Sequence, residues 1–161
     1  MKTRITAGAF LTCGEKILLM KRGLHKKLGP GKWAGIGGHI ELTDIKDPRA
    51  LKLKKTCLRE IKEEAGIKKT EIQKLRLRYI AINQTENEIR IHYHHIGELQ
   101  REIPLPKCSE GEFYWKYKSE IADLPMSITV KEAISHWINN PNSDSIYLVA
   151  VNGDIAAISE L

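Results

Sequence analysis

The stretch GGHIELTDIKDPRALKLKKTCLREIKEEAGI, residues 37–67, decides how this chain is interpreted. Near its end, Arg59, Glu60, Glu63 and Glu64 fall within six residues. Residues three and four apart lie on the same side of an α-helix, so a helix here would gather the three carboxylates together. Like charges that close destabilise a helix. A hard cation that prefers carboxylate and water oxygens, such as Mg²⁺, removes the repulsion.

The residues around this acidic cluster predict a long helix. Asp47 suits the N-cap, Pro48 suits the first helical position, and Gly66 suits the residue just past the end. The apolar residues between them recur at helical spacing: Ala50, Leu53, Cys57, Leu58 and Ile61. We therefore expect a helix that begins near residue 47 and ends at Gly66.

A solvated acidic helix face is the alternative interpretation of the cluster. A second feature favours a functional site, because the glycine-dense turn Gly35-Ile36-Gly37-Gly38 lies upstream. Without side chains, Gly37 and Gly38 would let the backbone approach a metal ion or a phosphate closely. A glycine turn followed by a carboxylate-lined helix suits diphosphate chemistry, in which carboxylates hold a metal ion that neutralises phosphate charge and orients water.

These residues resemble the signature of the Nudix hydrolases: a Gly, five residues, a Glu, seven residues, then Arg-Glu-apolar-x-Glu-Glu-x-Gly-apolar. REIKEEAGI, residues 59–67, matches the second half at every defined position, and Gly38 matches the opening Gly. The first half departs from the pattern, because Asp44 stands where the Glu is expected. Fourteen residues, 45–58, separate Asp44 from Arg59 instead of seven.

The longer spacing amounts to a seven-residue insertion before Arg59. Seven residues are close to two helical turns, so the helix face drifts by only about 20°. We expect the insertion to lengthen the front of the helix, or the loop before it, without disturbing the acidic cluster. The added length is basic and should stay solvated: Arg49, Lys52, Lys54 and Lys55. On this view Asp44→Asn matters far less than Glu64→Gln.

The resemblance covers roughly residues 5–140. GKWAGIGG, residues 31–38, is similar to the approach to the box in family members that hydrolyse nucleoside triphosphates, including oxidised ones. Residues 16–22 resemble the preceding strand, which commonly ends in Lys or Arg. Residues 110–115, with Leu124-Pro125, resemble the family's later Glu-x-x-Trp and Leu-Pro strand and turn.

The resemblance implies a role for each box residue. Glu63 and Glu64 would coordinate Mg²⁺, with Mn²⁺ as an alternative ion. Glu60 would be either a third ligand or the base that activates water. The Gly38 carbonyl is a further candidate ligand, and Arg59 would orient Glu60.

Residues outside the box are candidates for the metal and substrate sites. Glu112, or with less support Glu110, could complete the metal site from a later strand. The alternative for either is an exposed strand acid. Arg22 and Lys32 could reach phosphate or could simply be solvated, and Gly37 would lie at the substrate. Trp33 could stack on a base, although an aromatic residue in such a loop more often packs.

The rest of the chain indicates one α/β domain over residues 1–161, with the Nudix fold: a mixed, curved sheet sandwiched between helices. Strands are expected at residues 7–12, 16–21, 75–82, 88–96, 111–118 and 145–151, a second helix at 129–139, and a long loop at 23–38. In the strand at 88–96, His92 and His94 would share one face and His95 the other. A polar cross-strand pair is favoured there over a zinc site.

Composition narrows the class of partner. The net charge of +6 attracts polyanions, including phosphates. No cluster interleaves basic and aromatic residues, which argues against a nucleic-acid partner. No apolar run approaches the roughly 20 residues of a membrane helix, and the three widely spaced cysteines argue against a disulfide framework. We therefore expect a cytoplasmic protein with a small-molecule nucleotide substrate.

The reaction implied is attack by a metal-activated water on a phosphorus of a nucleoside diphosphate linked to another group. A nucleoside triphosphate, giving a monophosphate and pyrophosphate, is the first expectation. A dinucleotide or a nucleotide sugar such as ADP-ribose is the second. A Nudix-like regulator that binds nucleotides or RNA without hydrolysis is the third, and the presence of Glu60, Glu63 and Glu64 favours the enzymes over it.

Overall fold

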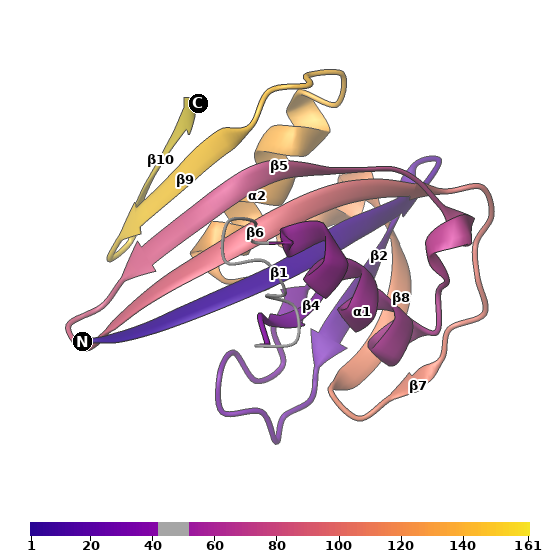
Figure 1. Cartoon of the computed structure of the whole chain (residues 1–161), viewed down its shortest axis with the longest axis horizontal. Helices are drawn as coiled ribbons and strands as arrows, with labels where there is room; N and C mark the ends of the chain where they lie inside the picture. Colours follow the sequence, from indigo (N-terminus) through magenta and orange to yellow (C-terminus); the bar gives the residue numbers. More distant parts are fainter. Residues whose placement is uncertain (42–51) are drawn as a thin grey trace.

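The computed structural model describes residues 1–41 and 52–161 (Figure 1). Within these residues the helices are α1 (Leu53–Ala65) and α2 (Ile128–Asn139), with short 3₁₀ helices η2 (Lys69–Glu71) and η3 (Lys118–Asp123). The strands are β1 (Lys2–Cys13), β2 (Lys16–Arg22), β3 (Trp33–Ala34), β4 (Ile36–His39), β5 (Ile72–Gln84), β6 (Glu88–Leu99), β7 (Lys107–Cys108), β8 (Gly111–Tyr117), β9 (Tyr147–Asn152) and β10 (Ile155–Glu160).

All of these strands join one mixed sheet in the order β10-β9-β5-β6-β1-β2-β8-β7, with β3 beside β2 and β4 beside β1. The strands predicted at residues 7–12 and 16–21 are confirmed, and β1 and β2 pair antiparallel from Leu11↔Leu18 to Cys13↔Lys16. β1 also runs parallel to β6 along nearly its whole length. β1 is therefore a central strand, which pairs with β4 at its middle and with β2 at its C-terminal end.

The two faces of the sheet carry two separate apolar cores. On one face, α1 packs through Cys57 and Ile61 against side chains such as Leu11 and Ile36. On the other, α2 packs through Ile134 and Trp137. Figure 1 shows α1 in front of the sheet and α2 behind it. The predicted fold class, a mixed sheet sandwiched between helices, is confirmed.

Helix α1 begins later than predicted. It starts at Leu53, and Lys52 before it has non-helical backbone angles and no side-chain capping bond. The predicted start at Asp47-Pro48 lies outside the described residues, as do Asp44 and most of the insertion. The predicted end is confirmed, because Gly66 takes the left-handed conformation at φ 68° and its N–H donates to the Lys62 carbonyl.

Residues 23–38 were expected to form a loop, and this prediction is wrong for their second half. β3 occupies residues 33–34 and β4 residues 36–39, and β4 pairs antiparallel with β1 through Gly8↔Gly37. The physical reason is the glycine pair itself. A Cβ on Gly37 would lie 2.6 Å from the Gly8 Cα, and a Cβ on Gly8 would lie 2.4 Å from the Ile36 carbonyl oxygen. Two facing glycines thus let a short strand approach β1 more closely than side chains would permit.

Candidate active site

Helix α1 presents the box residues beside its buried stripe. Cys57, Ile61 and Ala65 face the sheet. Glu60 and Glu64 lie next to this stripe, and the Glu60 side chain is only 12% exposed. Glu63 is turned further toward solvent, at 58% exposure. The predicted placement of three carboxylates on one side of one helix is therefore realised, with a gradient from buried to exposed.

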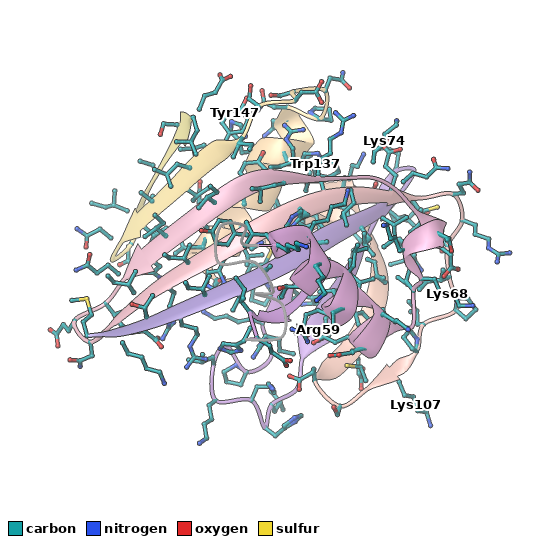
Figure 2. The ribbon with its side chains drawn as sticks, in the orientation of Figure 1. Arg59, Lys68, Lys74, Lys107, Trp137 and Tyr147 are labelled. Atoms are coloured by element: carbon teal, nitrogen blue, oxygen red, sulfur yellow. The ribbon has the colours of Figure 1, made fainter. Side chains whose placement is uncertain are left out.

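Arg59 joins the carboxylates to the glycine turn (Figure 2 labels its position on α1). Its Nη1 lies 2.7 Å from Glu60 Oε1 and 3.2 Å from Glu63 Oε2. Its Nη2 donates to the His39 carbonyl oxygen at 3.0 Å, and Glu41 Oε1 lies 3.6 Å from Nη1. The guanidinium thus ties α1 to the end of β4 and holds Glu60 in place, as expected for a positioning role. The contacts with His39 and Glu41 were not predicted.

Gly38 leaves room for the Glu60 carboxylate. A Cβ at position 38 would lie 2.4 Å from the Glu60 carboxyl carbon, so only glycine fits with the carboxylate in this position. Burial raises the pKa of Glu60, and the charge and hydrogen bond of Arg59 partly oppose that shift. The turn and the helix are therefore fitted to each other at the carboxylate.

Glu64 is the most perturbed acid of the group. Its pKa is raised to about 7, first by burial and then by the charges of Glu60 and Glu110. A hydrogen bond from the Gly37 N–H and the charge of Arg22 act in the opposite direction. In the described part of the chain, Glu64 Oε2 is buried with no hydrogen-bond partner. A buried, unpartnered carboxylate oxygen among like charges is what a bound cation would stabilise.

The donor chemistry fits a hard divalent cation. Carboxylate and carbonyl oxygens are the ligands that Mg²⁺ prefers, and Glu64, Glu60, Glu63 and the Gly38 carbonyl supply that type. As the side chains lie, no three acidic, histidine or cysteine side chains in residues 1–41 and 52–161 are grouped to hold an ion. Arg59 engages both Glu60 and Glu63, so these two side chains would have to turn from the guanidinium to bind metal.

The structure reverses the expected order of Glu112 and Glu110. Phe113 belongs to the core beneath α1, so the neighbouring Glu112 points to the opposite face of β8, where Tyr114 Oη donates to its Oε2 at 2.5 Å. Glu110 precedes β8, and its charge raises the pKa of Glu64. Lys26 forms an ion pair with Glu110. The alternation along residues 111–117, with Phe113 buried and Trp115 partly buried, was the sequence signal that could have placed Glu112 on the other face.

Comparison with known proteins supports the same assignment. A family profile described as the NUDIX domain matches residues 2–141. The chain belongs to the Nudix family. It is a Nudix hydrolase, and the resemblance seen in REIKEEAGI and Gly38 is confirmed. A comparison with curated proteins finds no match.

Solved structures show the same fold at low sequence identity. A MutT protein from Bacillus halodurans is 20% identical, with 97% of each chain covered and a TM-score of 0.68. A Nudix hydrolase from Nitrosomonas europaea is 17% identical over 94% of this chain and 80% of that one, with a TM-score of 0.71. The NUDIX domain of Shewanella oneidensis NrtR, solved with ADP ribose, is 17% identical over 88% and 90%, with a TM-score of 0.66.

Of the residues predicted to bind substrate in this Nudix hydrolase, Arg22 and Gly37 lie near Glu64, whereas Lys32 is exposed to solvent. Arg22 ends β2, donates from Nε to the Leu28 carbonyl oxygen at 2.9 Å, and lowers the pKa of Glu64 through its charge. Gly37 contacts Glu64 through its N–H. Lys32 is exposed. These three positions stay predictions as substrate contacts.

Trp33 packs in the core. Trp33 is only 8% exposed and belongs to the core on the α2 side of the sheet. Its ring centroid lies 5.2 Å from that of Tyr114, and Lys116 Nζ lies 5.3 Å from the ring centroid. The packing alternative is therefore the one that the structure favours, because the buried ring leaves little surface for a base to stack on.

None of the helices in residues 1–41 and 52–161 could span a membrane. The cytoplasmic location stays a prediction.

The predicted faces of the three β6 histidines are confirmed. His92 and His94 stack with centroids 5.9 Å apart, and Phe10 stacks on His94 at 5.3 Å. His95 lies on the α1 side, where its Nδ1 is 3.1 Å from the Gly8 carbonyl oxygen. Burial lowers the pKa of His92 to about 4 and that of His94 to about 3.

These lowered pKa values predict a loss of stability in mild acid. The unfolded histidines take up protons below about pH 6.5, whereas the folded ones stay neutral down to about pH 4. The free energy of unfolding should therefore fall between about pH 6.5 and 4, by about 1–2 kcal/mol per histidine at pH 5. Urea unfolding of the metal-free protein at pH 8 and pH 5 measures this change.

The matched variants are His94→Phe and His25→Gln. His94→Phe should reduce the pH dependence, because it removes one buried titrating group. His25→Gln should keep the full pH dependence, because His25 is exposed. Equal pH dependence in wild type and His94→Phe would contradict the prediction.

Proposed function

We propose that this Nudix hydrolase uses a divalent cation, Mg²⁺ or Mn²⁺, to hydrolyse a nucleoside triphosphate to a monophosphate and pyrophosphate. The observation that carries the proposal is the Glu64 carboxylate. It combines a pKa near 7 with an unpartnered buried oxygen and lies beside the Gly37 N–H. A cation at this carboxylate offsets the cost of burying its negative charge and the repulsion from Glu60 and Glu110. It also places a positive charge that can bind phosphate next to the glycine turn.

Each residue has a separate task in the proposal. Glu63 and Glu64, with the Gly38 carbonyl, hold the cation. Mg²⁺, when bound, neutralises phosphate charge and orients the attacking water. Glu60 accepts the proton of that water or serves as a third ligand, and its raised pKa favours proton uptake. Arg59 positions Glu60 through the 2.7 Å contact and is a positioning residue.

The choice of a triphosphate rests on the GKWAGIGG segment and on Arg22. The segment resembles the approach to the box in nucleoside triphosphate hydrolases, and in the structure it becomes β3 and β4. Arg22 lies close enough to lower the pKa of Glu64 through its charge, so its guanidinium is available near the cluster for a phosphate oxygen. Glu110 is proposed as a further metal ligand in place of Glu112.

ADP-ribose is the second candidate substrate. The structural neighbour from Shewanella oneidensis NrtR was solved with ADP ribose and shares the fold over most of both chains. A diphosphate linking two nucleosides or sugars presents the same anhydride to the metal cluster. The difference lies in which groups flank it.

A substrate panel tests the proposal. Nucleoside triphosphates, their oxidised forms, dinucleotides and ADP-ribose are incubated with and without Mg²⁺, and the products are separated by ion-exchange chromatography. We expect metal-dependent release of monophosphate and pyrophosphate from a triphosphate. Turnover confined to ADP-ribose or dinucleotides would show that the proposed substrate is wrong, while the assignment as a Nudix hydrolase would stand. Tight binding of a nucleotide with no turnover of any substrate would indicate a non-catalytic regulator and refute the proposal.

A further inference from the structure

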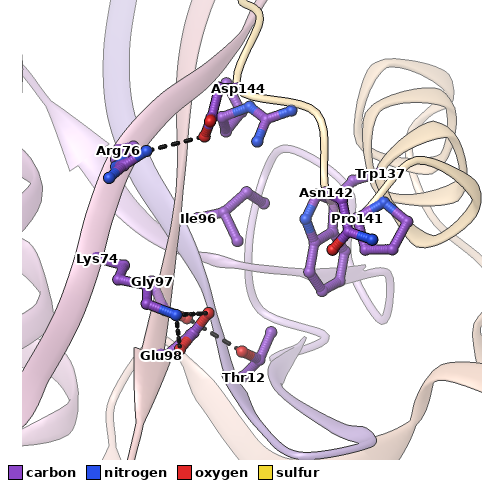
Figure 3. Close-up of a pocket in the computed structure, with 11 residues that line it drawn as sticks. Thr12, Lys74, Arg76, Ile96, Gly97, Glu98, Trp137, Pro141, Asn142 and Asp144 are labelled. Carbon is purple, nitrogen blue, oxygen red and sulfur yellow. Dashed lines mark hydrogen bonds and ion pairs between the residues drawn. The ribbon is translucent and has the colours of Figure 1, made fainter.

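A concave site lies on the α2 side of the sheet, away from the acidic cluster. It is a cavity of about 310 Å³ between β5, β6 and the segment that leads from α2 into β9. Figure 3 shows Trp137 and Asn142 on one side of it, and Arg76 and Lys74 on the other. Ile96 and Trp137, which line it, belong to the core beneath α2, whereas the box residues lie on the α1 face.

Two shifts in the register between β5 and β6 lie beside the basic side chains of this cavity. The register with β6 shifts between Gln73 and Arg76 and again between Leu77 and Tyr79. At the first shift Lys74 has a φ of 50°, a left-handed conformation that a non-glycine residue rarely adopts. At the second shift Arg78 is the extra residue. Lys74, Arg76 and Arg78 all line the cavity beside these shifts.

Arg78 is the unusual member of this set. It is a charged residue that is only 5% exposed. Its Nε donates to the Ser145 carbonyl oxygen at 2.9 Å, which ties β5 to the segment before β9. Its Nη2 is buried and has no hydrogen-bond partner in the described part of the chain. An unpartnered donor on a buried cation is costly, and a bound anion would satisfy it.

The carboxylates near Arg78 are engaged by other cations. Asp144 Oδ1 pairs with Arg76 Nη1 at 2.8 Å, and Glu98 Oε2 pairs with Lys74 Nζ at 3.3 Å. Among residues 1–41 and 52–161, Arg78 forms no ion pair within 4.0 Å. Three cationic side chains and two carboxylates therefore line the cavity. The positive charge that no carboxylate compensates is that of the buried Arg78.

We propose that this cavity is an oxyanion site in which Arg78 binds the phosphate group of a small molecule. The site goes beyond the proposed hydrolysis, because it shares no residue with the metal cluster. A phosphate offers several acceptor oxygens to a guanidinium and its basic neighbours. Trp137 and Pro141 provide an apolar wall for the rest of a phosphate ester.

A phosphate titration followed by two-dimensional amide NMR tests the site. The protein is kept in EDTA at constant ionic strength, so that the acidic box holds no metal to attract phosphate. We expect saturable shifts at the amides of Gly97 and Asn142. We expect Arg78→Gln to raise the Kd for inorganic phosphate at least tenfold.

Two controls separate the site from general charge effects. Lys2→Gln removes one positive charge at the opposite end of β1, where Lys2 is exposed, and should leave the Kd within twofold of wild type. Glu64→Gln should also leave it unchanged, so failure of the proposed hydrolysis and failure of this site give different results. Equal Kd values for wild type and Arg78→Gln, or shifts that never saturate, would overturn the proposal.

Two exposed substitutions keep the test decisive if Arg78→Gln does not fold. The Asp144 side chain is 82% exposed and that of Arg76 is 61% exposed, so neither substitution should unfold the protein. Asp144→Asn frees Arg76 and should tighten phosphate binding at least twofold, whereas Arg76→Gln should weaken it. If the cavity binds no phosphate, neither variant changes the titration, and that result would overturn the proposal.

Two further ligands identify the source of the oxyanion. Adenosine monophosphate should bind at least as tightly as inorganic phosphate if the apolar wall contacts the rest of an ester. Succinate should bind more weakly than phosphate at the same ionic strength. Tighter binding of succinate would overturn the phosphate assignment.

Discussion

Glu64→Gln is expected to abolish most of the hydrolysis by this Nudix enzyme. In the proposed site, the substitution removes the charge of a metal ligand whose Oε2 is buried without a hydrogen-bond partner among the described residues. Loss of metal-based charge stabilisation costs several kcal/mol in sites of this kind, so turnover should fall by about 10²–10³-fold at saturating Mg²⁺. The measurement is the initial rate of pyrophosphate release from the best substrate of the panel. Glu63→Gln should act in the same direction.

Glu112→Gln is the matched control for this prediction. It removes the same charge from β8, but on the face opposite α1, where Tyr114 donates to the carboxylate. Its turnover should stay within twofold of wild type. Folding of Glu64→Gln should survive, because removing one of several clustered negative charges relieves repulsion. Near-normal turnover in Glu64→Gln, or a large loss in Glu112→Gln, would refute the assignment of the metal cluster.

The neighbouring substitutions Gly37→Ala and Gly38→Ala should have opposite consequences. A Cβ at Gly37 meets only backbone, at 2.6 Å from the Gly8 Cα and 2.7 Å from the Ala7 carbonyl oxygen. Because β4 would have to move away from β1, we expect a loss of about 1–3 kcal/mol in the free energy of unfolding, measured by urea denaturation. A Cβ at Gly38 meets the end of the Glu60 side chain, which can rotate away.

Gly38→Ala should therefore cost activity rather than stability. Displacing Glu60 from its contact with Arg59 should lower turnover at least about tenfold, in the range of lost general acid–base catalysis. The free energy of unfolding should change by less than about 1 kcal/mol, as for substitutions that only shift a flexible side chain. Full turnover in Gly38→Ala would show that Glu60 does not act from the position seen beside the glycine turn.

The sequence by itself determined that a helix carries the three carboxylates, where this helix ends, and the family. REIKEE at i, i+3 and i+4 spacing requires the carboxylates to share one side of any helix, whatever surrounds it. Gly66 ends the helix because a left-handed residue without a Cβ is needed there, a local requirement visible in one residue. The alternation that separates His95 from His92 and His94 is likewise local, and it is confirmed.

Only the tertiary structure decided which distant residues join the site. Strand alternation separates Glu112 from Phe113, but only the pairing of β8 with β2 showed that the Phe113 face lies toward α1. Glu110, which precedes β8, is the acid whose charge acts on Glu64. The two bulges that bring Arg78 beside Trp137 are also invisible in residue pattern, because they depend on the pairing of β5 with β6. Local spacing sets what one helix or strand presents, whereas strand register and packing between elements set which charges meet and which are left buried without a partner.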